Sequence, residues 1–438
     1  MSRSSDQFLQ FFRGTSPYIH AHRGKTLVVY LSGEALEHGS RELTHDLALL
    51  RSLGLRLVVV FGTRPQVSEA FDREALQETF HGSLRVTTAD SLQTVVAAAQ
   101  TVLVRLQAEF STGLVNSPMH GAAVRTVSGN YIYAKPQGIL DGVDFQYTGA
   151  VRSVAAHDIS HQLDAGNIVL VPPYGFSVTG EVFNLSALEI AHECARAVKA
   201  DKLVILGDIS ALPPAEVQGQ YTPRELRQYL DTHASNTLNY PEVEAALTAC
   251  QSGTSRVHLL AADQPGALLI ELYTRDGCGI MVSRDEYDTF RTANPEDIGG
   301  ILELLQPLET GGVLVRRSRE QLERNIREFV VNERDGMVVG CAALHPFDSD
   351  LGKQAELACV AVHPEYRTRG RGASLLAHIE RQAAAQGVQR LFALSTQTIH
   401  WFQEHGFEQG QLSDLPDERQ ALYNYQRNSR IFIKTICL

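Results

Sequence analysis

Short apolar runs alternate with helix-like stretches over the first two thirds of the chain. Four of these runs are apolar at successive positions rather than at every second one, and they span residues 26–31, 55–61, 167–171 and 202–206. Runs of this kind are typical of strands that are buried on both faces. Together with helix-like stretches such as 45–53 and 185–200, they predict a mainly parallel sheet that is covered by helices on both sides.

The rhythm changes beyond a polar stretch at residues 283–291, and we interpret residues 284–294 as a linker. After it, the pattern predicts an α+β domain without the strict alternation of the first region. The expected helices span 295–305, 318–329, 373–386 and 399–405, the expected strands span 313–315, 356–362, 391–394 and 421–436, and a hairpin covers 330–344. The sequence therefore predicts two domains, at residues 1–283 and 295–438.

The composition is that of a globular protein and argues against several other classes. The chain has 438 residues, of which 44% are hydrophobic and 20% charged, and its formal net charge is −11. A general nucleic-acid-binding protein needs a basic surface, which this charge opposes. The six cysteines form no CxxC pair, so we interpret them as reduced thiols. We see neither an apolar run as long as a membrane span nor a signal peptide, and we expect a cytoplasmic protein.

One short basic turn stands out against this acidic background. It spans residues 367–372, with the sequence Arg-Thr-Arg-Gly-Arg-Gly, and lies between the apolar run 357–362 and a helix-like stretch that begins at Ala373. Glycines let the backbone approach a ligand closely, and the free N–H groups of a helix start attract an anion. Arginines add fixed positive charge and donors that match a phosphate. The turn therefore predicts a binding site for a pyrophosphate.

The same six residues fit the R-x-x-G-x-G/A motif with which the GCN5-related N-acetyltransferases bind the pyrophosphate of acetyl-CoA. Residues 399–407, Ile-His-Trp-Phe-Gln-Glu-His-Gly-Phe, are similar to a stretch that this family often carries after its fifth strand. The resemblance implies acetyl-CoA as co-substrate, with its pantetheine arm paired to the backbone of the preceding strand. The residues that it assigns to acetyl-CoA are Val360, Val362, Arg367, Arg369, Gly370, Arg371, Gly372 and Ala373.

Residues 24–283 resemble the amino-acid kinase family, and acetylglutamate kinases most closely. Segments 166–175, 200–208 and 257–282 carry this resemblance. Three positions depart from it. Tyr30 stands where these kinases have a lysine that meets the ATP phosphates, residues 61–65 replace their glycine-rich loop, and Leu188 replaces their catalytic aspartate. Because phosphoryl transfer depends on positioning and cationic charge, we expect a kinase fold without kinase activity.

The order of the two domains is similar to that of the bacterial N-acetylglutamate synthase family, and residues 16–26 resemble its opening segment. The implied fold class is α/β, with a three-layer amino-acid-kinase-like domain and a mainly parallel sheet, followed by an α+β GCN5-related N-acetyltransferase domain. The implied activity is acetyl transfer from acetyl-CoA to L-glutamate, the first step of arginine biosynthesis. Relatives also suggest feedback inhibition by L-arginine and a homo-oligomer in the form of a hexamer.

Acetyl transfer from a thioester to an amine needs a base, a group that polarises the carbonyl, and a proton donor for the thiolate. Glu356 begins the strand before the basic turn, and a glutamate on this strand commonly serves as the base in the acetyltransferase family. We expect Glu356 to share a strand face with Ala358, Val360 and Val362, and the N–H of Val360 or a neighbour to polarise the carbonyl. Ser395 follows another predicted strand, near the expected CoA sulfur. It either donates a proton to the thiolate or caps the next helix, and the sequence leaves both open.

A dicarboxylate acceptor such as glutamate calls for cations in its pocket, because arginine binds carboxylates in a bidentate manner. The resemblance assigns the acceptor to Arg316, Cys359, Arg427 and Ser429. At Cys359 the main chain is expected to bind the substrate amine, and the thiol to be packed rather than nucleophilic. Arg317 and Arg319 stay alternatives to Arg316.

Arginine-inhibited acetylglutamate kinases bind arginine between an N-terminal helix and the last part of the domain. The residues here that correspond to that site are Tyr18, Lys202, His258, Glu271 and Gly277. By this resemblance, Glu271 faces the cationic end of the ligand.

Three alternative functions stay open. They are a bifunctional synthase and kinase, a non-catalytic amino-acid sensor, and an acetyltransferase for a different amine. His157 and His161 are four residues apart, as zinc ligands on a helix are, but no third ligand is evident. We therefore predict no metal site.

Overall fold

The computed structural model describes residues 3–112, 124–209, 219–233, 240–274, 277–284, 289–334, 336–349, 352–367, 370–397, 399–424 and 429–436. The chain forms two compact units, Met1–Asp285 and Glu286–Leu438, which we describe separately. No helix of the described residues is long and apolar enough to cross a membrane.

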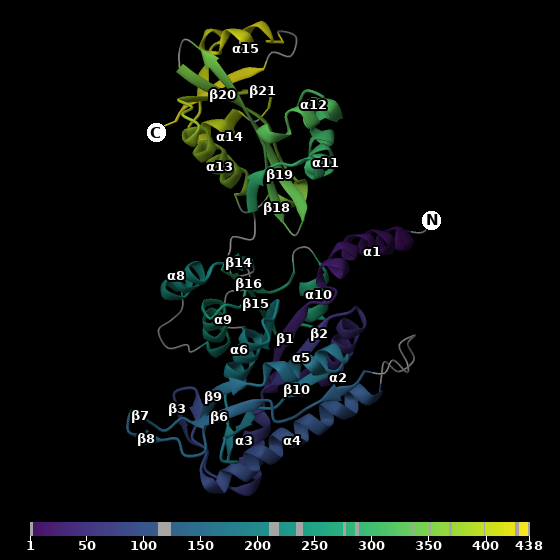
Figure 1. Ribbon diagram of the computed structural model, residues 1–438, viewed down its shortest axis with the longest axis vertical. Helices are drawn as coiled ribbons and strands as arrows, with labels where there is room; N and C mark the ends of the chain where they lie inside the picture. The colour runs from purple at the N-terminus through teal and green to yellow at the C-terminus, as the bar shows by residue number, and fades with distance from the viewer. Residues whose placement is uncertain are drawn as a thin grey trace. The chain divides into compact units, whose positions relative to one another are not determined.

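An eight-stranded sheet forms the centre of the first unit (Figure 1). In spatial order its strands are β14 (Gly219–Tyr221), β16 (Ile280–Ser283), β15 (Arg256–Ala261), β13 (Lys202–Gly207), β1 (Thr26–Leu31), β2 (Arg56–Phe61), β10 (Ile168–Val171) and β5 (Thr126–Val127). Neighbouring strands are parallel except β15 and β16. The four apolar runs that the sequence analysis assigns to buried strands are β1, β2, β10 and β13, which confirms the prediction of a mainly parallel sheet.

Two hydrophobic clusters cover the two faces of this sheet. Along β1, Val28 and Tyr30 belong to one cluster, and Leu27 and Val29 to the other. The first cluster includes side chains from α5 (Ala156–Asp164), α6 (Ala187–Ala197) and α9 (Pro241–Gln251). The second includes side chains from α2 (Gly33–Ser52), α4 (Ala89–Thr112) and α10 (Ala267–Tyr273). The alternation along a fully buried strand thus produces three layers.

The remaining elements of the first unit surround this core. The other helices among its described residues are α1 (Arg3–His22), α3 (Arg64–Glu74) and α8 (Pro223–His233). A second sheet has the order β12 (Val182–Asn184), β11 (Tyr174–Phe176), β6 (Ile132–Pro136) and β9 (Gly149–Val154). Two short hairpins are β3 (Phe80–His81) with β4 (Leu84–Arg85), and β7 (Ile139–Leu140) with β8 (Val143–Asp144).

A seven-stranded sheet organises the second unit (Figure 1). Its order is β17 (Thr289–Thr292), β18 (Phe329–Arg334), β19 (Met337–Ser349), β20 (Gly352–Val362), β21 (Arg390–Ser395), β23 (Arg430–Thr435) and β22 (Glu408–Gly410). Only β20 and β21 pair in parallel. Helix α13 (Arg371–Ala385) packs on one face, and α11 (Ile298–Thr310) and α12 (Arg319–Arg324) pack on the other. Two further short helices are α14 (Ile399–Glu404) and α15 (Asp417–Ala421).

Several element bounds differ from the sequence-based expectation. Residues 313–315 form no strand, because the N–H groups of Val313 and Leu314 both donate to the carbonyl of Leu308 and so terminate α11. The helix expected over 318–329 ends at Arg324, since the fully buried Phe329 already begins β18. Strand β17 lies inside the segment that the sequence analysis assigns to a linker.

Candidate active site

An opening between β20 and β21 lies at the carboxyl ends of these two parallel strands. Their pairing runs from Gln354–Arg390 to Glu356–Phe392, and among the described residues no pair follows, although β20 continues to Val362. On its other edge, β20 stays paired with β19 up to Val362. Backbone groups of β20 beyond Glu356 therefore face the opening, where an extended ligand can bind them as an added strand would.

A β-bulge in β20 changes which side chains face the same way. Cys341 of β19 pairs with Ala361, but Ala343 pairs with Ala358, so β20 contains one extra residue. Cys359 lies in this bulge with a left-handed φ of 53°.

The bulge reverses the alternation of side chains along β20. Leu357 packs in the cluster on the α13 side, whereas Cys359 packs in the cluster on the opposite side. Ala358 packs with Cys359, and Val360 packs on the α13 side. The prediction that Val360 shares the face of Ala358 is therefore wrong, because the sequence pattern does not reveal the bulge.

The predicted pyrophosphate turn leads directly into α13. Gly370 precedes this helix in a left-handed conformation with φ 70°, and no side chain caps the helix start. The N-terminal N–H groups of α13 are thus available for an anion. An added Cβ at Gly372 would lie 3.4 Å from the Trp401 ring, so the helix start packs closely against α14. Ala373 is half-buried in the first turn of α13, and residue Arg369 of the turn lies outside the described residues.

The two described arginines of the turn have different surroundings. Arg367 is exposed, and its Nε donates to the carbonyl of Val362 at 3.4 Å. Arg371 is buried, its guanidinium lies over the Tyr366 ring, and its Nη1 donates to the Tyr366 carbonyl at 3.4 Å. Arg371 thus supports the shape of the turn from inside, and Arg367 is the one at the surface.

A cavity of 850 Å³ is lined by residues of both β20 and β21 next to this opening. The segment 313–317, helix α12, strands β19 and β20, and the segment that follows α15 form its walls. Among its lining residues are four that the sequence analysis assigns to the acceptor or to catalysis, namely Arg316, Glu356, Cys359 and Ser429. Arg427 lies outside the described residues. Residues far apart in the chain thus meet in one cavity beside the candidate donor site.

Glu356, the candidate base, forms a bidentate ion pair with Arg419. Nε of Arg419 lies 2.7 Å from Oε2 of Glu356, and its Nη2 lies 3.1 Å from Oε1. The two side chains are only 12% and 19% exposed. A bidentate pair fixes the orientation of a carboxylate, so Arg419 positions Glu356 at the cavity wall. No sequence pattern indicates this role for Arg419, which is 63 residues from Glu356 in the chain.

Arg317 rather than Arg316 points toward the strand. Its Nη1 donates to the sulfur of Cys359, and its backbone N–H donates to Glu309 at 3.0 Å. Arg316 lines the same cavity but is exposed, and Arg319 forms an exposed ion pair with Glu323 outside the cavity lining.

The thiol of Cys359 is not poised to act as a nucleophile. Burial raises its pKa to about 11, although Arg317 acts in the opposite direction. A neutral thiol is a poor nucleophile, which fits the expectation that it is packed.

His345 is a second lining residue that the sequence analysis does not single out. Its Nδ1 contacts a carboxylate oxygen of Glu328, and its side chain is largely buried. Ser395 ends β21 next to the lining residue Leu394, and its Oγ accepts a hydrogen bond from the N–H of Gln397 at 3.3 Å. Helix α14 begins only at Ile399, so this bond orders the loop ahead of the helix.

The residues assigned to an arginine site meet in the first unit around Glu271. Nδ1 of His258 lies 2.6 Å from Oε1 of Glu271, and the N–H groups of Cys278 and Gly279 donate to Oε2 at 2.8 and 3.0 Å. Burial alone would raise the pKa of Glu271, but these hydrogen bonds and His258 lower it to about 2. The carboxylate is therefore held in its charged form.

Of the three further assigned residues, Gly277 lies beside this carboxylate, and Lys202 and Tyr18 are connected to it through His258 and His22. An added Cβ at Gly277, whose φ is 64°, would lie 2.3 Å from Oε2 of Glu271. The charge of Lys202 acts on both His258 and His22. The carbonyl of Tyr18 bonds Nδ1 of His22 at 2.8 Å. Helix α1 is thus connected to the same neighbourhood.

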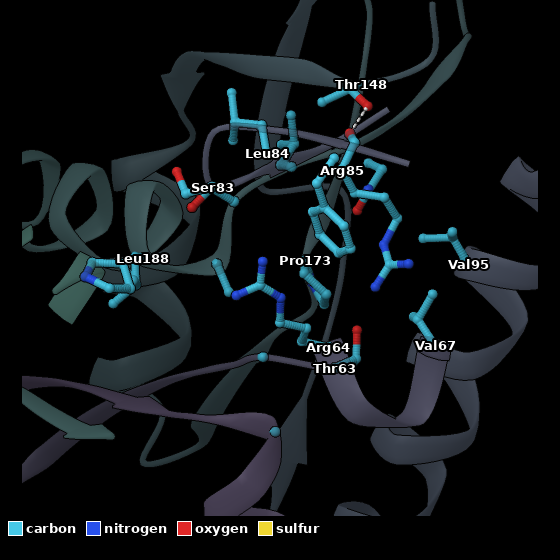
Figure 2. Close-up of a pocket in the computed structure, with 18 of the residues that line it drawn as sticks. Thr63, Arg64, Val67, Ser83, Leu84, Arg85, Val95, Thr148, Pro173 and Leu188 are labelled. Atoms are coloured by element: carbon cyan, nitrogen blue, oxygen red, sulfur yellow. Dashed lines mark hydrogen bonds between the residues drawn. The ribbon is translucent and has the colours of Figure 1, made fainter. Parts of the chain in front are cut away.

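A smaller pocket of 180 Å³ lies at the carboxyl ends of β1, β2 and β10 (Figure 2). It brings together the three departures from the kinase pattern, namely Tyr30, residues 62–64 and Leu188. Ligands of parallel α/β sheets bind at such ends. No group of three or more potential metal ligands occurs among the described residues.

Comparisons with known proteins cover the same two units. The Amino acid kinase family matches residues 25–261, and the Acetyltransferase (GNAT) family matches residues 299–407. The amino-acid acetyltransferase of Ectopseudomonas mendocina (strain ymp) is 45% identical over 435 residues, which cover 98% of this chain and 99% of that protein. These matches confirm the predicted fold class of each region.

Two solved structures extend the comparison. N-acetylglutamate synthase from Neisseria gonorrhoeae, complexed with coenzyme A and L-arginine, is 37% identical, with a TM-score of 0.87 over 98% of this chain and 100% of that chain. The same enzyme complexed with coenzyme A and N-acetyl-glutamate has a TM-score of 0.62 at the same identity and coverage. The chain thus belongs to the amino-acid acetyltransferase family and is an acyltransferase that uses acetyl-CoA as its co-substrate.

Proposed function

We propose that the acceptor is L-glutamate and that the product is N-acetyl-L-glutamate, made in the first step of arginine biosynthesis. The observation that carries this proposal is the cavity beside the opening of β20, where Arg316 and Arg317 lie near the candidate base Glu356. Glutamate has two carboxylates and one amine, which match two cations and one base. The gonococcal relative bound to coenzyme A and N-acetyl-glutamate supports the same acceptor.

In the proposed reaction, acetyl-CoA binds along β20. Its pyrophosphate lies at the start of α13 and near Arg367, and its pantetheine arm bonds backbone groups of residues 360–362. A backbone N–H near Val360 polarises the thioester carbonyl, as an oxyanion hole does. Donor binding thus relies mainly on backbone groups.

The acceptor amine approaches the thioester from the cavity. Glu356 takes one proton from the ammonium, directly or through a water, which leaves a neutral amine. The amine nitrogen forms a bond to the carbonyl carbon, and the bond from that carbon to sulfur breaks. The nitrogen then loses its second proton and the departing thiolate gains one, with Ser395 either donating a hydrogen bond to the thiolate or relaying that proton. Because transfer is direct, no acyl intermediate on Cys359 is needed.

The cations of the cavity select the acceptor by its carboxylates. Arg317 is held at Cys359 beside the reacting centre, and Arg316 is exposed at the cavity wall. We expect Arg316, together with Arg427 and Ser429, to bind the carboxylates, and Arg317 to bind them or to hold the strand in place.

We also propose that L-arginine inhibits the reaction by binding near Glu271 in the first unit. The charged, hydrogen-bonded carboxylate of Glu271 suits a guanidinium group. The gonococcal relative complexed with L-arginine supports this regulation. Inhibition requires that arginine bind two states of the protein unequally.

The test is release of coenzyme A from acetyl-CoA, measured with each of the common amino acids. Glutamate should be the sole good acceptor, and millimolar arginine should slow its acetylation. Arg316→Met should raise the KM for glutamate by tenfold or more, about the loss of one charged contact. Arg319→Met is the matched control and should leave the KM unchanged, since Arg319 pairs with Glu323 instead.

Other outcomes would favour the alternatives. Acetylation of lysine peptides but not of glutamate would refute the acceptor. Binding of acetyl-CoA without turnover of any amino acid would indicate a sensor. ADP release from ATP in the presence of N-acetylglutamate would indicate a bifunctional enzyme.

A further inference from the structure

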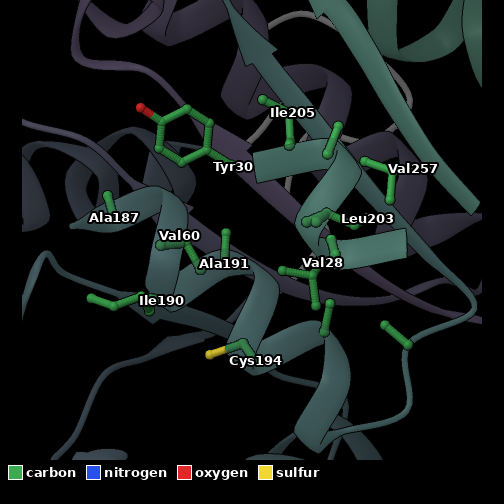
Figure 3. Close-up of a cluster of buried hydrophobic side chains, with 14 of the residues drawn as sticks. Val28, Tyr30, Val60, Ala187, Ile190, Ala191, Cys194, Leu203, Ile205 and Val257 are labelled. Carbon is green, nitrogen blue, oxygen red and sulfur yellow. The ribbon is translucent and has the colours of Figure 1, made fainter. Parts of the chain in front are cut away.

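The 180 Å³ pocket of the first unit contains polar groups that the fold itself does not use. Tyr30 is only 7% exposed and belongs to the hydrophobic cluster on the α6 side of the sheet. Its hydroxyl points away from the other side chains of that cluster (Figure 3). That hydroxyl faces the pocket, because an added Cβ at Gly62 would lie 3.1 Å from it. Within the described part of the chain, no group forms a hydrogen bond with this hydroxyl.

A second unused hydroxyl lies at the start of α3. Thr63 precedes this helix and is only 6% exposed, yet its side chain does not cap the helix. The next residue, Arg64, extends its guanidinium into the pocket, as Figure 2 shows, where it lies 4.7 Å from the centre of the Phe80 ring. Among the described residues, no carboxylate forms an ion pair with Arg64. This end of the pocket is therefore positive and offers donors.

Two carboxylates also line this pocket. Glu34 lies in the first turn of α2, and the half-buried Glu242 lies in the first turn of α9. Burial raises the pKa of Glu242, and the charges of Glu34 and Asp208 raise it further. Over the described residues, neither Glu34 nor Glu242 has an ion-pair partner. The charge of Arg64 lowers the pKa of Glu242 from a distance, but neither carboxylate forms an ion pair in the described chain.

The charges at the positive and at the negative end of the pocket both act on the Tyr30 hydroxyl. Burial raises the pKa of Tyr30, the charges of Glu242 and Glu34 raise it further, and the charge of Arg64 opposes them. The Tyr30 hydroxyl is therefore near a cation and two carboxylates, each without an ion-pair partner in the described chain. A small ligand with one negative and one positive group would therefore neutralise the charge of Arg64 with the first and the charges of Glu34 and Glu242 with the second.

The volume of the pocket and the residues of its wall limit which ligands it can bind. The volume of 180 Å³ corresponds to about six waters, at roughly 30 Å³ each, so the ligand is a small molecule and not a whole nucleotide. Part of the wall is apolar, formed by Val67, Phe80, Leu84, Val95 and Leu188. A phosphate or nucleotide would bring its negative charge close to Glu34 and Glu242 as well as to Arg64, and it would meet Tyr30 and Leu188 where the kinases have a lysine and an aspartate.

We propose that this pocket binds a free α-amino acid with a short apolar side chain, whose carboxylate contacts Thr63 and Arg64 and whose ammonium contacts Glu34 and Glu242. The Tyr30 hydroxyl bonds the ligand between its two charged ends. This site is separate from the residues around Glu271 and from the second unit, so it does not depend on the proposed acceptor or effector. The first unit thereby has a second ligand site on its sheet.

The test is calorimetric titration of the full-length protein with L-valine, and with two analogues that each lack one charge. Isovalerate lacks the amine, and isobutylamine lacks the carboxylate. Valine should bind at one site per chain, and each analogue should bind at least tenfold more weakly, because a charged hydrogen-bonding group is lost. Equal binding of valine and isovalerate, or binding of inorganic phosphate with no binding of valine, would overturn the proposal.

Variants locate the site in the molecule. Arg64→Met and Glu242→Gln should each weaken valine binding at least tenfold, and Tyr30→Phe severalfold, since it removes only a hydroxyl. Arg73→Met is the matched control on the same helix, because Arg73 pairs with Glu69 outside the pocket lining, and it should bind valine like the parent. Thermal unfolding of each variant checks the fold. Valine binding that survives the first two substitutions in folded protein would refute the assignment, whatever the result for glutamate acetylation.

Discussion

Replacing Arg419 by methionine would remove one partner of the buried ion pair at the cavity wall. Glu356 would keep its carboxylate, 12% exposed, without the two hydrogen bonds that Arg419 now donates. Exposed ion pairs contribute below about 1 kcal/mol, and breaking a fully buried pair costs about 3–5 kcal/mol. For a pair with 12% and 19% exposure, we expect a loss of about 2–3 kcal/mol in the free energy of unfolding of the second unit.

The chain offers a probe for this unit alone, because its one tryptophan is Trp401 in α14. Urea unfolding followed by tryptophan fluorescence therefore reports the second unit. With a slope of about 2 kcal/mol/M, the expected loss lowers the midpoint by about 1–1.5 M. The double variant Arg419→Met with Glu356→Gln should recover most of this loss, since no unpaired carboxylate remains.

Comparison of the parent, both single variants and the double variant isolates the interaction between the two side chains. A coupling free energy below about 0.5 kcal/mol would refute the reasoning, because it would mean that the pair acts like an exposed one. Acetyl transfer by Arg419→Met should fall as well, through a lower kcat rather than a raised KM for acetyl-CoA. Arg419→Lys, which keeps the charge but not the bidentate geometry, should recover little activity.

Three further predictions concern other parts of the chain. Gly277→Ala should weaken inhibition by arginine at least severalfold in a rate assay, because the added Cβ would lie 2.3 Å from Oε2 of Glu271, and unchanged inhibition would contradict the site. The pKa of Glu271 is lowered from 4.5 to about 2, so its charge stabilises the fold above pH 4.5 and this contribution disappears as the pH falls through 2. Acid unfolding by circular dichroism should therefore depend less on pH in Glu271→Gln, and identical curves would argue against a charged carboxylate. Cys359→Ala should retain acetyl transfer within a few fold, and Cys359 of the parent should resist alkylation at neutral pH, since the pKa of its thiol is about 11.

The parts of the fold that the sequence predicts are those set by residues that are neighbours in the chain. The central strands of the first unit are continuous apolar runs, and the strand, turn and helix around residues 357–385 follow one another directly in the chain. Each is decided by neighbouring residues, so periodicity and turn chemistry suffice. The kinase-like departures also come together in the structure, because strand ends in a parallel sheet meet at one edge.

The parts that sequence reasoning misses depend on distant or irregular chain. Nothing near Arg419 in the sequence indicates that its guanidinium meets Glu356 across 63 residues. The choice between Arg316 and Arg317 follows from the irregular segment after α11, where the alternation of a strand does not apply. The bulge at Cys359 leaves the apolar pattern of the run 357–362 unchanged, and it shows in the structure through the pairing with β19 and the left-handed φ of Cys359.

The extra residue of the bulge at Cys359 places Glu356 and Val360 on different faces of β20, whereas a regular strand would place both on one face. Upstream of it, Glu356 lines the cavity proposed for the acceptor, whereas Val360 packs on the side of α13, whose start is the proposed donor site. Substitutions around the cavity can therefore change which amine is accepted without disturbing the contacts that hold the acyl donor. Acceptor choice can therefore change in evolution or by design through substitutions on the cavity face of β20, while the α13 face is kept.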